Sequence, residues 1–118
     1  MSEYVIASMR HTGSGDYAVT LWGPSDSGYT PNLDDAGKYG EEVVERFKDH
    51  LKDDFPIEYE LAKRIAVERE YNYSGWKAGH FIINDEMFRN TFGLDKKCHY
   101  KSPSNKRYFR FAKEAPNE

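Results

Sequence analysis

The sequence is poor in cysteine and in long hydrophobic runs, and both shortages narrow the kinds of protein it can be. Its 118 residues include one cysteine, Cys98. A single cysteine cannot form a disulfide within its own chain, which favours a reducing compartment. No apolar stretch approaches the roughly 20 residues of a membrane-spanning helix, and the start of the chain lacks the basic and apolar segments of a signal peptide. We therefore expect a cytoplasmic protein with no membrane partner.

Recognisable patterns for catalysis or metal binding are also missing. The histidines, Cys98 and the acidic residues follow no metal-ligand spacing. Cys98 stands next to His99, but no local signature marks it as a nucleophile. The stretch Gly13–Asp16 joins two expected strands, whereas a phosphate-binding loop opens a helix. We therefore predict no catalytic residue, no metal site and no cofactor, and we expect that the protein is not an enzyme.

Aromatic side chains, in contrast, are abundant. They make up 15% of the chain, with nine tyrosines and two tryptophans. These amphipathic rings are enriched where proteins bind one another, so their number favours a binding surface. The overall length corresponds to a single domain over residues 1–118.

Hydrophobic spacing predicts a mixture of strands and helices. Residues 4–12 and 17–22 are expected to pair as a hairpin across a glycine-containing loop. Helices are predicted over 40–52 and 85–94, and a strand followed by a helix within 55–71. Residues 72–79 are expected to form a loop, 80–84 and 106–112 strands, and 113–118 a frayed tail. This order indicates an α+β fold: a small antiparallel or mixed sheet starting with the N-terminal hairpin, with two to three helices packed on one face.

Acidic residues concentrate in the first half of the chain. Residues 34–60 hold ten aspartates and glutamates against four lysines and arginines. This block is either the ordinary solvated face of a helix, or a carboxylate surface that binds a basic partner or imitates a nucleic-acid backbone. The candidate partner-binding residues on the expected helix are Glu41, Glu42, Glu45, Asp49 and Asp53.

Basic residues concentrate near the other end. Between Lys96 and Lys113 there are seven lysines and arginines, no acid, and four interleaved aromatic residues. Such a segment can follow phosphates and stack on bases, or it can be an edge strand whose charges prevent aggregation. The candidate residues for binding a partner or nucleic acid are Lys96, Lys97, Tyr100, Lys101, Lys106, Arg107, Tyr108 and Arg110.

The segment from Leu21 to Tyr39, LWGPSDSGYTPNLDDAGKY, is dense in turn-forming and aromatic residues. Its glycines suit tight turns, so we interpret it as a structural corner that leads into the first helix. We expect Trp22 and Tyr29 to pack beneath that helix. The recurring positions of its pattern are Trp22, Gly23, Pro24, Gly28, Tyr29, Thr30, Leu33, Ala36, Gly37 and Tyr39.

This pattern resembles a segment of small, uncharacterised phage and prophage accessory proteins, in which a hairpin ending in Trp is followed by Gly-Tyr-Thr and an Ala-Gly corner before an acidic helix. The resemblance covers residues 1–50 and carries no catalytic residue. It implies an accessory protein of the bacterial host cytoplasm that binds a bacterial protein or ribonucleoprotein stoichiometrically, as anti-CRISPR inhibitors of host defence do. Two alternatives remain: a nucleic-acid-binding module that uses the basic segment, and a small enzyme or nucleotide-signal-binding protein with an aromatic-lined pocket.

Overall fold

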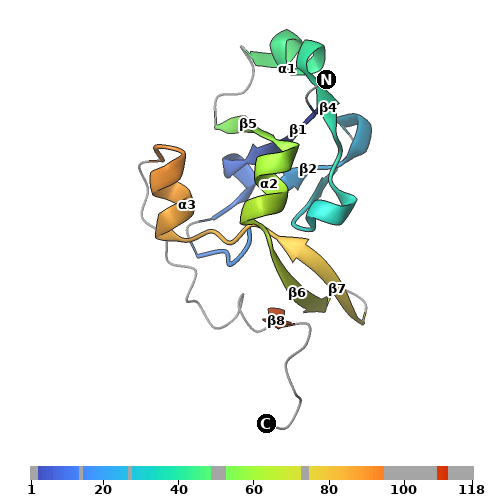
Figure 1. The fold of residues 1–118 in the computed structure, drawn as a ribbon, viewed down its shortest axis with the longest axis vertical. Coiled ribbons are helices and arrows are strands. Elements are labelled where there is room, and N and C mark those ends of the chain that lie inside the picture. Colours follow the sequence, from blue (N-terminus) through green and yellow to red (C-terminus); the bar gives the residue numbers. More distant parts are fainter. Residues whose placement is uncertain are drawn as a thin grey trace, which may run out of the picture.

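Two antiparallel sheets and several short helices make up the fold (Figure 1). The computed structural model describes residues 3–13, 15–26, 28–48, 53–72, 75–94 and 109–111. The predicted α+β class is confirmed.

The first sheet is built around β1 (Glu3–Ser8), which has partners along both of its edges. One edge pairs with β5 (Asp54–Glu58) over the whole of Tyr4–Ser8. The other edge pairs with β2 (Leu21–Trp22) and β4 (Tyr39–Gly40) in turn, and β3 (Tyr29–Thr30) extends the sheet beyond β2. Because neighbours also cover both of its faces, Val5, Ile6 and Ala7 are fully buried, which explains the continuous apolar run in the sequence.

The N-terminal hairpin forms, but its connection is longer than the sequence suggested. β1 and β2 are antiparallel neighbours, with Ala7 opposite Leu21. Between them lie a 3-10 turn, η1 (Met9–His11), and residues 17–19, whose backbone pairs with residues 82–84 and not with β1. The Val19 N–H donates to the Ile82 carbonyl at 2.8 Å, and the Asn84 N–H donates to the Tyr17 carbonyl at 2.8 Å. The predicted second strand is therefore divided between two partners.

The second sheet has the order β7-β6-β8 and corrects the prediction of a loop over 72–79. In place of that loop, β6 (Val67–Asn72) and β7 (Trp76–Phe81) form an antiparallel hairpin. Its strands are mostly polar, so no alternating pattern marked them, and the end of the predicted 55–71 helix is in fact β6. β8 (Phe109–Phe111) lies within the predicted terminal strand and pairs with β6; the tail 113–118 is outside the described residues.

All three predicted helices are present, in shorter form. They are α1 (Glu41–Phe47), α2 (Tyr59–Ile65) and α3 (Glu86–Thr91). α3 begins where the Asp85 side chain accepts the Phe88 N–H at 2.8 Å. Ala62 of α2 and Phe88 of α3 join the apolar core on β1, whereas α1 has no fully buried residue. Residues 49–52 of the predicted first helix are outside the described part.

The segment from Leu21 to Tyr39 is a corner, held by close backbone contacts. The Gly37 N–H donates to the Trp22 carbonyl at 3.0 Å, and the Tyr39 hydroxyl donates to the Gly23 carbonyl. Trp22 packs edge-on against Phe47 of α1, as expected. Tyr29 does not lie beneath the helix; it is 48% exposed and stacks on a histidine of η1, His11.

We predict that Gly37→Ala destabilises the protein by about 1–3 kcal/mol, because the added methyl has no room. A Cβ at Gly37 would lie 2.6 Å from the Gly23 carbonyl oxygen, and that backbone cannot move without disturbing the corner. Gly13→Ala is the matched control: its Cβ would meet only the Asp16 side chain at 3.7 Å, and its change should stay within about 0.5 kcal/mol. Urea unfolding of both variants measures the difference, and equal midpoints would contradict the prediction.

Candidate functional site

A buried carboxylate, Asp54, joins three parts of the first sheet. It begins β5 and is 2% exposed. It accepts hydrogen bonds from the Trp22 indole at 2.9 Å, the Ser8 hydroxyl at 3.1 Å and the Arg10 guanidinium at 3.2 Å. The carboxylate thus has a charged partner and two neutral donors.

These contacts make Asp54 a structural anion, not a proton acceptor. Burial alone would raise the pKa of Asp54, but the hydrogen bonds from Arg10, Trp22 and Ser8 outweigh it and lower the pKa. Ser8 also lies 3.0 Å from Nδ1 of His11. In a catalytic triad the imidazole stands between hydroxyl and carboxylate; here the fully buried Ser8 hydroxyl is in the middle, so the arrangement does not match one.

The register of the first sheet gathers carboxylates at one end of it. Glu41 and Glu42 open α1, directly after Gly40. Glu3 is paired with Gly40, and Glu58 is paired with Tyr4, the next residue of β1. We call Glu3, Glu41, Glu42 and Glu58 the acidic end; all four are exposed, and within the described ranges none has an ion-pair partner.

The acidic end overlaps only in part with the residues proposed from sequence. Glu45 is bound to Lys48 at 2.7 Å, and the pair is exposed. Asp53 is exposed just before β5, and Asp49 is outside the described residues. Sequence reasoning missed Glu3 and Glu58, since only the strand register places them at the same end of the first sheet as Gly40, the residue before α1.

The basic segment falls almost wholly outside the described residues. Arg110 is the exception, and its backbone in β8 pairs with Glu70 of β6. The other proposed residues remain predictions: Lys96, Lys97, Tyr100, Lys101, Lys106, Arg107 and Tyr108.

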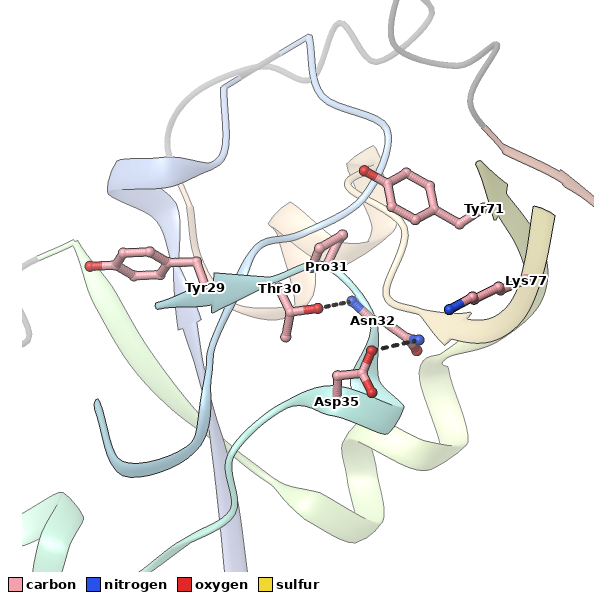
Figure 2. A pocket seen from close by; sticks show the side chains of 7 residues that line it. All are labelled: Tyr29, Thr30, Pro31, Asn32, Asp35, Tyr71 and Lys77. Atoms are coloured by element: carbon pink, nitrogen blue, oxygen red, sulfur yellow. Dashed lines mark hydrogen bonds between the residues drawn. The ribbon is translucent and has the colours of Figure 1, made fainter. Parts of the chain in front are cut away.

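A cavity of about 260 Å³ lies between the corner and the β6–β7 hairpin (Figure 2). Tyr71 and Lys77 are cross-strand neighbours on the hairpin and form one side. The other side comes from β3, the chain after it, and a 3-10 turn, η3 (Leu33–Asp35). Its lining residues are Tyr29, Thr30, Pro31, Asn32, Asp35, Tyr71 and Lys77.

Asn32 fixes the two sides of this cavity to each other. Its Oδ1 accepts the Asp34 N–H at 3.0 Å and the His80 N–H at 3.1 Å. Its Nδ2 donates to Asp35 at 3.3 Å. The strand β7 approaches this amide closely, since a Cβ at Gly79 would lie 2.7 Å from it and would displace the Asn32 side chain. His80 adds an exposed contact to Asp34 at 3.1 Å.

A second hollow, of about 220 Å³, lies beside α3 and is mainly apolar. Met87 at its rim is 74% exposed. Its lining residues are Ile65, Val67, Ile82, Ile83, Asp85, Met87, Phe88, Thr91 and Phe92.

Across the described ranges, no three His, Cys, Asp or Glu side chains converge as metal ligands would. In the same part of the chain, no helix has the length and apolar character needed to cross a membrane. Comparison with family models, curated proteins and solved structures finds no match to this chain.

We predict that Asp54→Asn destabilises the protein by about 1–3 kcal/mol at pH 7, because the charged acceptor shared by three donors is lost. The pKa of Asp54 is lowered from 3.8 in the folded protein. Its stabilisation is therefore fully present above that value and is lost as the pH falls through the lower, folded value. Urea unfolding between pH 7 and the acid range should show the difference between wild type and variant shrinking with falling pH.

Asp53→Asn provides the control for this pH series, since it alters the neighbouring, exposed aspartate. Its effect should remain within about 0.5 kcal/mol throughout. A difference for Asp54→Asn that persisted unchanged into acid would contradict the proposed role of its charge.

Proposed function

We propose that this protein acts by stoichiometric binding, with its acidic end docking on a basic surface of a bacterial protein or ribonucleoprotein. The resemblance of residues 1–50 to phage and prophage accessory proteins supports a role in counter-defence. In this role the protein would act in the bacterial cytoplasm as an inhibitor of the anti-CRISPR kind. The proposal assigns no catalytic step to the chain.

The observation that carries the proposal is the placement of four exposed glutamates from three elements at the same end of the first sheet. Glu3 of β1, Glu58 of β5 and the start of α1 lie at this end. Clustered like charges repel one another and weaken the folded state. A partner with lysines or arginines at matching positions relieves that repulsion, and its approach is accelerated by the field of the cluster.

The placement of α1 suits this role. Figure 1 shows α1 at one extremity of the molecule, away from the β6–β7 hairpin. Its apolar residues Val43, Val44 and Phe47 are half-buried. The helix thus has an apolar side against the protein and glutamates facing solvent, which leaves its outer surface accessible to a large partner.

Other carboxylates of the acidic block are less suited to a partner. Asp54 is enclosed by its donors, and Asp34, Glu45 and Glu60 already contact basic side chains. Among the described carboxylates of the block, the glutamates of α1's first turn and Glu58 are exposed without an ion-pair partner and lie at one end of the first sheet. Their position favours a defined docking point over imitation of an extended nucleic-acid backbone.

We predict that replacing Glu41, Glu42 and Glu58 together by glutamine weakens inhibition of a CRISPR system. Bacteria carrying a CRISPR system would express the full chain and be challenged with a phage that the system targets. Wild-type protein should restore plaque formation, and the triple variant should restore about tenfold less, because removal of three charges slows association. The plaque counts of the strains, measured at matched protein levels, give the result.

The matched control replaces three other exposed glutamates, Glu60, Glu68 and Glu86, by glutamine, so that the net charge changes equally. This control should protect the phage as wild type does. If both triple variants lose activity alike, net charge and not the acidic end is responsible. If the wild-type chain protects phage from none of a panel of CRISPR types, the counter-defence proposal is wrong.

A further inference from the structure

We propose that the cavity between the corner and the β6–β7 hairpin binds a single nucleotide. Its base would lie against Tyr71 and Pro31, its phosphate at Lys77, and a base N–H at Asp35. This inference goes beyond the proposed partner binding and rests on different residues, since none of the cavity residues belongs to the acidic end.

The first argument is a pair of opposite charges that share the cavity without neutralising each other. Lys77 comes from β7 and Asp35 from η3, and both are exposed. Among the described residues, neither has an ion-pair partner within 4.0 Å. Asp35 accepts a bond from Asn32 at one carboxylate oxygen, and its other oxygen has no side-chain partner within the described ranges. A ligand with an anionic group and a separate N–H donor satisfies both side chains.

The second argument is a flat wall on the hairpin side of the cavity, formed by the ring of Tyr71. Tyr71 is half-buried, and its ring stacks on Phe109 at a centroid distance of 4.6 Å and packs against Phe81 at 5.7 Å. These contacts hold the tyrosine in place before any ligand arrives. Pro31 faces the same cavity from the corner. A planar ring that enters here is stacked at little cost in conformational entropy.

The polar rim is also fixed in advance. Asn32 is held by its bonds to two backbone N–H groups and to Asp35. Thr30 accepts the Asn32 N–H at 3.1 Å, and no acceptor for its own hydroxyl proton lies among the described residues. Figure 2 shows Lys77 extending from the hairpin toward Asn32, with Tyr71 on the neighbouring strand. A hydroxyl donor, a carboxylate acceptor, a lysine cation and a tyrosine ring therefore line the same cavity.

Size restricts the ligand class. The cavity, at about 260 Å³, lies just below the range of roughly 300–1,000 Å³ for typical small-molecule sites. It suits one base with its sugar, while the phosphate reaches the exposed Lys77 amine. Among ligands of this size, a nucleotide combines a flat ring, an N–H edge and an anion on one molecule.

The test is to titrate the full chain with candidate ligands and to monitor binding through the chemical shifts of its backbone amide NMR signals. The probes are the four ribonucleoside monophosphates, their nucleosides and inorganic phosphate. We expect at least one monophosphate to shift the amides around Thr30, Tyr71 and Lys77, and to bind about fivefold or more tightly than its nucleoside. In Lys77→Ala that preference should disappear, whereas Lys48→Ala, which removes an exposed lysine directly after α1, should retain it.

Asp35→Asn separates base recognition from phosphate binding: it should weaken nucleoside and nucleotide alike. A single-stranded hexanucleotide of the preferred base shows whether the ligand is a free nucleotide or part of a strand. If the hexanucleotide binds more tightly than the monophosphate, the ligand is a strand. If the two bind equally, the ligand is a free nucleotide. The inference is overturned if no probe saturates the signals by about 10 mM. It also falls if inorganic phosphate alone reproduces the shifts at Tyr71, or if Lys77→Ala keeps the phosphate preference.

Discussion

The carboxylate of Asp54 is the contact on which the arrangement of the first sheet depends. It lies where β5 begins, yet its donors come from the end of β1, from η1 and from β2. Trp22 carries this link further, since its ring packs against Tyr39 in β4 and Phe47 in α1. One buried charge therefore positions the helix whose outer face bears the glutamates of the acidic end.

Polar contacts help to hold the second sheet and the chain after it against the N-terminal half, beside the aromatic contact of Tyr17 with Phe109. Asn84 donates to the Gly13 and Asp16 carbonyls and accepts from the buried Arg89. Tyr17 accepts from Arg69 of β6. Buried polar groups that find all their partners favour one arrangement over near alternatives, because each would be costly to leave unsatisfied. The cavity lies along this junction, which explains how residues of a corner and a hairpin can line one site.

Local sequence patterns were sufficient for much of the fold and for little of the site. Val43, Val44 and Phe47 recur at helical spacing, and Asp85 and Gly93 stand at the ends of α3, so these helices could be found without a structure. The hairpin of β6 and β7 could not, because its polar strands are defined by long-range pairing and by the aromatic contacts of Tyr71 and Phe81. The same limit hid the positions of Glu3 and Glu58 and the placement of Asp35 and Lys77 around one cavity, which depend on register and tertiary packing. No local pattern distinguishes Asp54 from the other acids of residues 34–60, because its donors come from distant positions in the sequence.

Asn32 has a consequence for how this protein behaves beside copies of itself. β7 is the outermost strand of its sheet, and such a strand exposes backbone N–H groups that can recruit a strand from another molecule. At His80 that N–H is already occupied by the Asn32 amide, and the glycine before it lets the corner approach closely. The Asn32 side chain, which lines the cavity, thus also blocks the addition of a strand from another molecule at this part of the sheet edge. Such strand addition is one of the routes to aggregation.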